Sequence, residues 1–255
     1  MSLFARLHAA KRAASIHLLS SLGVALIAAL LVFGLWYPFP YRELAGGREL
    51  FMLVIAVDVV CGPLLTLVLF NPLKPRAELW RDLGMVALIQ LGALGYGLHT
   101  VWQARPLYLV MEVDRFKVVA APELDASAVV ALPVELQPRW HSGPILVAIR
   151  EPKNSEERNK VLFESVEGGR DYGERAEFYL PYEGNAALKS LQRAKPLAVF
   201  LQKYPEQKDA ALSIEHEKSG DMKQWLYLPV RAREDWIAIL DNKGVIMGFL
   251  KGDGF

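Results

Sequence analysis

Three long apolar segments lie within the first 103 residues of this 255-residue chain, and they constrain its fold more than any other feature. They cover residues 17–37, 50–70 and 83–102. Each has about twenty residues, which is enough for a helix to cross about 30 Å of hydrocarbon. We therefore expect three transmembrane helices. The first has a basic start like that of a signal peptide, but its length and the bulky sequence WYPFP at its end favour an uncleaved signal anchor.

The distribution of charged residues marks where the membrane region ends. Only thirteen of the 29 basic and 28 acidic residues precede Gln103, and the others follow it. We expect a membrane domain over residues 1–103, with the lipid bilayer as its partner, and a water-soluble domain over residues 104–255. The soluble part has nearly equal numbers of basic and acidic residues, so no nucleic-acid partner is expected.

The basic residues of the short loops predict the orientation. The N-terminal tail and the loop between the second and third apolar segments each have three Lys or Arg residues, and the loop between the first and second has two. Such residues favour the cytoplasmic side, so we expect a cytoplasmic N-terminus. Three crossings then place the soluble domain outside, in the periplasm of a Gram-negative cell.

An acidic residue, Asp58, lies at the centre of the second apolar segment. A carboxylate inside a bilayer costs a few kcal/mol, so it usually faces a partner or a polar cavity. Its helix also contains Gly62, which lets another helix approach, and Pro63, which favours a kink and frees a carbonyl. Thr66 lies two turns from Asp58 on the same face and can donate its hydroxyl to a freed carbonyl. Gln90 is a polar residue inside the third segment.

Three roles are open for Asp58. In the first it is protonated or bonded to Gln90, and the second and third helices form a packed hairpin. In the second it binds a polar group on a helix of another membrane protein. The third role, a proton or ion relay, is disfavoured because one acid in three helices gives no continuous polar path. Small residues in the third segment, among them Gly92, Gly95 and Gly97, also favour close helix packing.

The sequence shows no catalytic or metal-binding constellation. Cys61 is the only cysteine, which excludes an internal disulfide and a cysteine-based metal site. His141 and His216 are isolated, and we expect both to be surface polar residues. Paired acids and nucleophile–base sets are also missing from the pattern. We therefore expect a non-enzymatic protein without a cofactor or metal.

The soluble domain has the pattern of an α+β fold with an antiparallel sheet. The clearest element is a hairpin over residues 235–249 with its turn at 241–244. A turn at Asp114-Arg115 is expected to join two strands, although one long strand over 107–119 is an alternative. The remaining expected elements are strands at 106–113, 116–121, 144–149 and 224–231, helices at 154–167 and 182–194, and a short helix or strand at 197–204.

Some side-chain orientations follow from these elements. Helix 154–167 begins at the Asn154-Ser155 cap and should direct Val161, Leu162 and Val166 inward. The apolar face of helix 182–194 is expected at Leu188 and Leu191. Three tyrosines could form an exposed protein-binding face: Tyr172, Tyr179 and Tyr182.

Two sequence patterns are more specific than any single residue. The first is DVVCGPLLTLVLFNP, which begins at Asp58, and the second runs from Arg105-Pro106 to Asp114-Arg115-Phe116. In this order and at this spacing they resemble the type IV pilin accessory proteins of the TfpX/TfpZ group. The resemblance is strongest over residues 50–120, and the overall plan agrees along the whole chain.

The resemblance implies a bacterial inner-membrane accessory protein that acts as a chaperone. It would interact with a cognate type IV pilin, the major pilin, and with the pilus assembly machinery, promote pilin stability or assembly, and so support twitching motility. Asp114-Arg115 is then either a salt-bridged turn or a docking point near the membrane. The candidate residues for partner binding or helix packing are Asp58, Gly62, Pro63, Thr66, Gln90, Arg105, Pro106, Asp114, Arg115 and Phe116.

A membrane-anchored periplasmic sensor or ligand-binding protein is the alternative function. Its soluble domain would have the same α+β pattern, because such folds serve many functions. A sensor would also need a cytoplasmic output module, and this sequence shows none.

Overall fold

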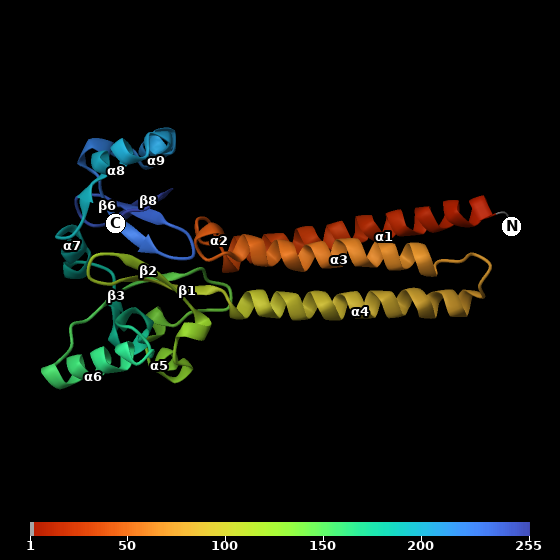
Figure 1. Ribbon diagram of the computed structural model, residues 1–255, viewed down its shortest axis with the longest axis horizontal. Coiled ribbons are helices and arrows are strands. Elements are labelled where there is room, and N and C mark those ends of the chain that lie inside the picture. The colour runs from red at the N-terminus through yellow and green to blue at the C-terminus, as the bar shows by residue number, and fades with distance from the viewer. Residues whose placement is uncertain (1–2) are drawn as a thin grey trace. The chain divides into compact units, whose positions relative to one another are not determined.

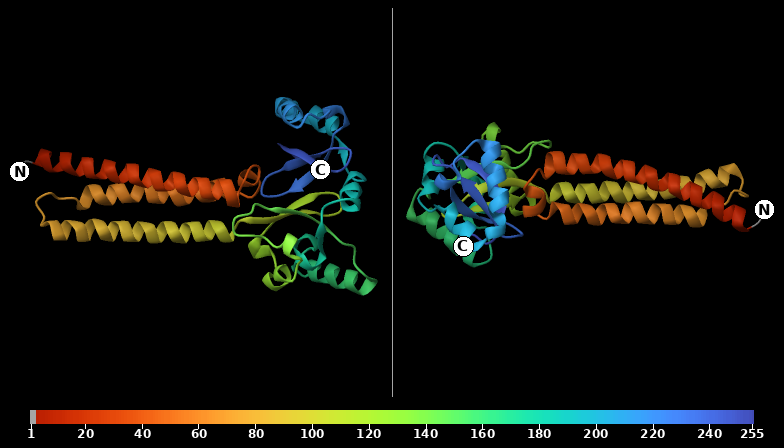
Figure 2. Two further views of the ribbon diagram at one scale, coloured as in Figure 1. Left: turned by 180° about the vertical axis from the view of Figure 1, so that it is seen from behind. Right: turned by 90° about the horizontal axis from the view of Figure 1, so that it is seen from above.

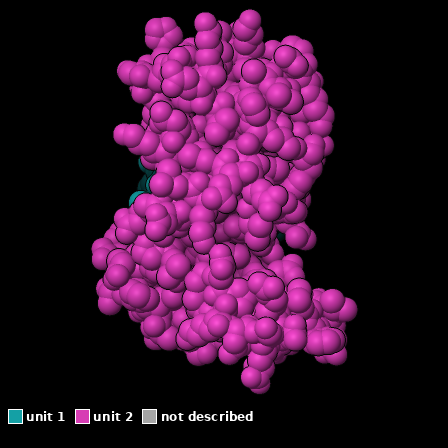
Figure 3. Space-filling model, turned by 90° about the vertical axis from the view of Figure 1, so that its left-hand side faces the viewer, with its two compact units in different colours: residues 1–38, 46–103 teal, residues 39–45, 104–255 magenta. Residues whose placement is uncertain are grey.

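The computed structural model describes residues 3–255 and divides into two compact units (Figures 1 and 3). Unit 1 contains the described residues up to Pro38 together with residues 46–103, and unit 2 contains residues 39–45 and 104–255. The predicted fold class, an N-terminal membrane-helix region followed by an α+β domain, is confirmed. Residues 39–45, which the sequence placed with the membrane helices, pack within unit 2 instead.

Unit 1 is a bundle of three long helices: α1 (Leu3–Leu31), α3 (Gly47–Leu69) and α4 (Arg76–Gln103). A π-helical turn, Val32–Trp36, continues α1. The three helices run side by side in both views of Figure 2, and α3 packs against both α1 and α4. Among the described residues, three helices are long and apolar enough to cross a membrane. All three begin before the predicted segments, since a helix can continue beyond the apolar residues that predict its membrane span.

Tyr37 and Gly47 close one end of the bundle. The Tyr37 side chain is 1% exposed, and its hydroxyl donates to the carbonyl oxygen of Val101 at 3.0 Å. A side chain at Gly47 would overlap the Tyr37 ring, so glycine allows this close approach. The rings of Phe33 and Phe51 meet edge to face at 5.0 Å between centroids.

Unit 2 is built on one mixed sheet. Within its described residues eight strands form the sheet, in the order β4-β3-β1-β2-β6-β7-β8, and β5 pairs with β6. The strands are β1 (Pro106–Met111), β2 (Phe116–Ala120), β3 (Ile145–Ile149), β4 (Tyr179–Pro181), β5 (Lys195–Pro196), β6 (Leu226–Arg231), β7 (Trp236–Leu240) and β8 (Ile246–Lys251).

Most strand pairs are antiparallel, as the sequence predicted, but β1–β3 and β2–β6 are parallel. Parallel neighbours need a long connection, and helical segments precede both β3 and β6. The β2–β6 pairing joins only Phe116 to Val230 and Lys117 to Arg231, so this contact links two halves of the sheet. The two-strand alternative at residues 106–121 is correct, and the single-strand alternative is wrong.

Apolar side chains cover both faces of the central strands. Leu109 and Met111 of β1 enter a core on one face, whereas Tyr108 and Val110 enter a core on the other. This alternation follows from the two-residue repeat of a strand. The first core, here called the central core, continues across both halves of the sheet to β6 and β7. A third core lies between β6–β8 and the last helices.

Short helices cover these cores (Figure 1). Asn154 caps helix α6 (Ser155–Val166) by accepting a hydrogen bond from the Glu157 amide at 2.8 Å, as predicted. Its expected inward face is only partly right, because Val161 is buried while Leu162 and Val166 are 51% and 86% exposed. The helices are α5 (Ala126–Val130), α6 (Ser155–Val166), α7 (Asn185–Leu191), α8 (Leu197–Lys203) and α9 (Lys208–Lys218).

Helix α7 is shorter than predicted and presents a different face to the core. Ala187 and Ser190 are buried, whereas Leu188 is 53% exposed. Leu191 packs against the central core as expected. Small residues therefore form the contact face, which lets α7 lie close to the sheet.

The segment between the first two membrane helices is part of unit 2. It forms the single-turn helix α2 (Tyr41–Leu44), and the Leu44 side chain is fully buried in the central core. The Tyr41 ring packs edge to face with Phe249 at 6.3 Å, and burial raises the pKa of Tyr41. The amide of Arg233 donates to the Leu44 carbonyl at 3.0 Å. This short segment is thus held by side-chain packing and by a backbone bond.

Candidate functional site

The polar residues predicted in the second and third membrane segments meet inside unit 1. Asp58 of α3 and Gln90 of α4 are 7% and 8% exposed. The Gln90 side-chain amide donates to the main-chain oxygen of Asp58 at 2.8 Å and to its Oδ1 at 3.3 Å. The geometry therefore places Asp58 against the neighbouring helix of its own chain.

Gly62 makes room for this contact, and it lies one turn beyond Asp58 on the same face of α3. A side chain at Gly62 would overlap the Gln90 amide, so the two helices can approach this closely only at glycine. Pro63 follows within α3 without ending the helix. Of the glycines in α4, Gly97 packs against Val54, whereas a side chain at Gly92 or Gly95 would meet nothing within 4 Å.

Thr66 is 2% exposed and joins α3 to α1 rather than to α4. Its hydroxyl lies 2.5 Å from Nδ1 of His17. The sequence suggested a bond from Thr66 to a freed carbonyl of its own helix, and the structure instead pairs it with another helix. His17 was missed because it stands at the very start of the first apolar segment. The sequence offered one signal for a polar face on this helix: Ser21 lies four residues, about one turn, after His17. The structure shows that Ser21 is also buried.

We call these five residues, His17, Ser21, Asp58, Thr66 and Gln90, the membrane polar cluster. The middle helix, α3, supplies one polar contact to each neighbour, to α1 through Thr66 and to α4 through Asp58. Hydrogen bonds between membrane helices contribute about 0.6 kcal/mol each on average. Since they also specify which faces meet, the cluster can set the register of the bundle. In residues 3–255 no group of three His, Cys, Asp or Glu side chains could hold a metal ion.

The second group of predicted site residues lies in unit 2, and three of them are interior. Arg105 is 7% exposed, and Pro106 begins the buried strand β1. Phe116 is fully buried in the central core, with its ring 5.7 Å from that of Tyr182. These positions form the start of the domain fold and are not available to a partner on its surface.

Asp114 and Arg115 form the turn between β1 and β2. The Arg115 guanidinium donates from Nε to Asp114 Oδ1 at 2.7 Å and from Nη2 to Oδ2 at 3.2 Å. These bonds hold the pKa of Asp114 below its ordinary value and raise the pKa of Arg115. The guanidinium also lies over the Phe255 ring at 4.7 Å. The geometry fits the salt-bridged turn, with both groups charged.

The three tyrosines do not form an exposed face. Tyr179 is 5% exposed, and its hydroxyl donates to the Gly173 carbonyl at 2.6 Å. Tyr172 and Tyr182 are half-buried. Tyr179 is interior because it belongs to the sheet, and the other two are partly covered because their rings pack against Phe178 and Phe116.

Three helices able to span a membrane, with a polar cluster among them, and a folded α+β unit define an integral membrane protein with a substantial water-soluble domain. A family model described as fimbrial assembly protein FimB matches residues 5–46. The chain is 32% identical over 249 residues to a fimbrial assembly protein of serogroup I from Dichelobacter nodosus, with 96% of each chain covered. It therefore belongs to the fimbrial assembly protein family.

Two further relatives come from the same organism. The fimbrial assembly protein of serogroup E1 is 32% identical over 250 residues, with 96% of each chain covered. The protein of serogroups C1 and C2 is 41% identical over 115 residues, which is 45% of this chain and 88% of that protein. No solved structure matches the chain.

Proposed function

We propose that this chain is an inner-membrane accessory protein of type IV pilus assembly, of the TfpX/TfpZ group. It binds a cognate pilin while that subunit waits in the membrane and promotes its stability or its incorporation into the pilus. It acts by binding, without catalysis or a cofactor. The N-terminus lies in the cytoplasm and unit 2 lies in the periplasm.

The observation that carries the proposal is the similarity to fimbrial assembly proteins over 96% of both chains. Because the match covers the membrane helices and the soluble domain together, the whole architecture is shared with those relatives. Fimbrial assembly requires contact with fimbrial subunits or with the machinery that joins them. A protein with both a membrane part and a soluble part is suited to bind a pilin that also has both parts.

The position of α2 supports the proposed topology. Helices α3 and α4 separate residues 39–45 from residues 104–255 in the chain, yet both segments belong to one folded unit. A segment can join a folded domain only on its own side of the membrane. Both ends of the α3–α4 pair therefore lie on one side, which fits three crossings. The basic residues of the N-terminal tail and of the loop between α3 and α4 favour the cytoplasm, which leaves the periplasm for unit 2.

The geometry of the membrane polar cluster favours helix packing as the role of Asp58. Its carboxylate and the Gln90 amide bond to each other inside unit 1. In the proposed function this pair keeps the bundle in one register, and a pilin helix would meet the outer surface of that bundle. Asp58→Ala should then lower pilin contact indirectly, through loss of the folded bundle.

The test is affinity capture of the full-length chain from membranes with the pilin of the same strain, together with a twitching assay on a deletion strain. We expect co-purification of the pilin and loss of motility. Normal pili and normal motility in the deletion strain would contradict the proposal. A reporter fused after Phe255 checks the orientation separately, since a periplasmic reporter should be active there.

A further inference from the structure

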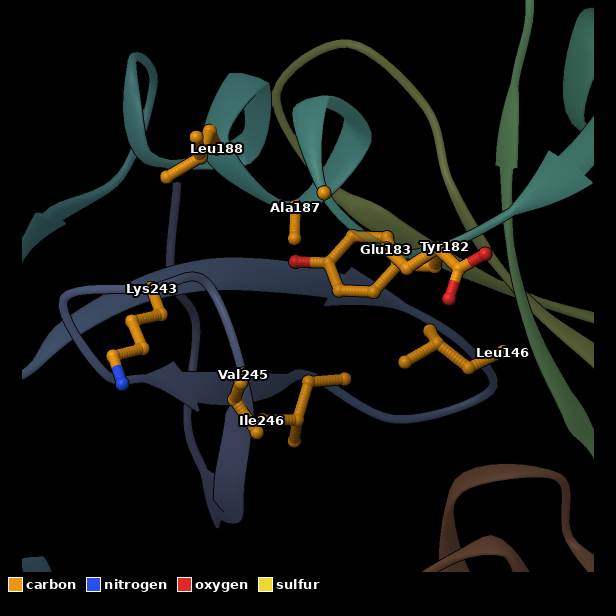
Figure 4. Close-up of a pocket in the computed structure, with 9 residues that line it drawn as sticks. Leu146, Tyr182, Glu183, Ala187, Leu188, Lys243, Val245 and Ile246 are labelled. Atoms are coloured by element: carbon orange, nitrogen blue, oxygen red, sulfur yellow. The ribbon is translucent and has the colours of Figure 1, made fainter.

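An open cavity of about 480 Å³ enters unit 2 beside the central core (Figure 4). It lies between strand β3, helix α7 and the turn that precedes β8. Its size is within the range of sites that bind small ligands. The lining residues are Leu146, Tyr182, Glu183, Gly184, Ala187, Leu188, Lys243, Val245 and Ile246.

The inner wall of the cavity is apolar and needs no further hydrogen bonds. The inner wall includes the hydroxyl of Tyr182. This hydroxyl lies 2.9 Å from Ser190 Oγ and donates a hydrogen bond to the Gly244 carbonyl at 2.7 Å. At the mouth, Leu188 and Val245 are 53% and 52% exposed. Apolar side chains held open at a concave site favour an apolar occupant, because covering them removes surface from water.

Two opposite charges stand at the rim. Glu183 and Lys243 are exposed, and neither forms an ion pair within residues 3–255. Their charged groups lie on different sides of the apolar wall in Figure 4. Complementary charges on a partner would therefore fix its direction across the cavity.

We propose that this cavity binds an extended peptide segment of the pilin, in which apolar side chains lie between a basic and an acidic residue. The basic residue pairs with Glu183, the acidic residue pairs with Lys243, and the apolar side chains fill the space beside Leu188 and Val245. The inference rests on the proposed function and names the surface of unit 2 that carries it out.

Other occupants fit the site less well. An acyl chain would cover the apolar wall, but it carries no pair of opposite charges that Glu183 and Lys243 could use to orient it. A second copy of this chain would have to bring its own segment of the same charge pattern to the cavity. An extended peptide satisfies the wall and both charges together.

The test compares two variants of the full-length protein in detergent, titrated with detergent-solubilised pilin. Val245→Trp fills the mouth of the cavity, and Val199→Trp adds the same ring at a valine of α8 with nearly equal exposure, 51% against 52%. Blocking a central apolar contact should weaken pilin binding about tenfold or more. Val199→Trp should bind pilin like the wild type.

Two charge variants test the rim independently of its shape. Glu183→Lys and Lys243→Glu lie at exposed positions, so both should fold normally, and each should weaken pilin binding about fivefold through like-charge contact. Raised salt should reduce the difference between each variant and the wild type. Thermal unfolding of all four variants shows that they are folded.

The outcomes separate the two proposals. Absence of pilin binding by the wild type would overturn the proposed function and this inference with it. Wild-type binding that Val245→Trp leaves unchanged would overturn the inference alone. Self-association of the chain that is lost in Val245→Trp, with pilin binding retained, would assign the cavity to a second copy and also overturn it.

Discussion

The amide of Arg233 donates a hydrogen bond to the carbonyl oxygen of Leu44 at 3.0 Å, joining the loop after β6 to a segment that lies between two membrane helices. Beside this bond, the Leu44 side chain fills the central core of unit 2 with no exposed surface. The soluble fold therefore requires a piece of chain that is far from it in sequence. The stability of unit 2 should therefore depend on helix α2, which contains Leu44.

We predict that Leu44→Ala destabilises unit 2 by about 2–5 kcal/mol, because a fully buried leucine leaves a cavity when it is truncated. Chemical unfolding of the full-length protein in detergent, followed by near-UV circular dichroism, measures the change. Leu162→Ala is the matched control, since Leu162 is 51% exposed on α6 and should change stability little. Equal effects of the two substitutions would contradict the assigned packing of Leu44.

Local signals in the sequence predicted several elements of unit 2 well. Asn154 marks the start of α6 through its side chain, and the turn at 241–244 ends in Gly244, which adopts a φ of +80°. Both signals act within a few residues and so can be read from the chain alone. The same holds for the three membrane helices, whose length and apolar composition suffice to identify them.

Features that depend on distant contacts were not predictable in this way. Nothing near Leu44 indicates that it packs against strands of the soluble domain, and the inward face of α6 was misjudged at Leu162. The parallel pairings β1–β3 and β2–β6 likewise depend on where long connections return the chain. In the candidate site, Asp58 and Gln90 stood out as polar residues in apolar segments, whereas His17 did not because polar residues are common at such a boundary.

The contact between α3 and α4 should depend on the absence of a side chain at Gly62. We predict that Gly62→Ala separates the helices and weakens the Asp58–Gln90 bonds, because the added carbon would overlap the Gln90 amide. The expected result is a lower unfolding temperature of the bundle in detergent and less protein in the membrane.

Gly95→Ala is the control for this substitution, since its added carbon would meet nothing within 4 Å. It should keep the wild-type unfolding temperature or raise it slightly, because alanine favours a helix over glycine. A bundle that tolerates alanine equally at both positions would show that α3 and α4 do not approach closely at Gly62.

The bond between His17 and Thr66 should couple α1 to α3. A double-mutant cycle with His17→Ala and Thr66→Val should give a coupling energy of about 0.6 kcal/mol, the average for such bonds between membrane helices. The free energy of unfolding in detergent provides the four values of the cycle. Ser20→Ala serves as a control partner for Thr66→Val, since Ser20 bonds the Ile16 carbonyl of its own helix. Zero coupling in the first cycle would mean that the His17–Thr66 bond does not stabilise the bundle.

The carboxylate of Glu157 should make the free energy of unfolding of unit 2 depend on pH in the acidic range. Two bonds from the Arg150 guanidinium, at 2.8 and 2.9 Å, and one from the Lys153 amide lower the pKa of Glu157 from 4.5 to about 2. A depressed folded pKa means that the unfolded chain takes up the proton first. The stabilising contribution is therefore complete above pH 4.5, and it is lost as the pH falls from 4.5 towards 2.

Glu157→Gln should accordingly lower the unfolding temperature of unit 2 at pH 7, and the difference from the wild type should shrink below pH 4.5 and vanish near pH 2. Thermal unfolding at several pH values measures this difference. The neighbouring substitution Glu156→Gln is the control, because Glu156 is exposed and forms no ion pair in the described part of the chain. A deficit of Glu157→Gln that is the same at every pH would trace its effect to lost packing, since a charge interaction must disappear once the wild-type carboxylate is protonated in both states.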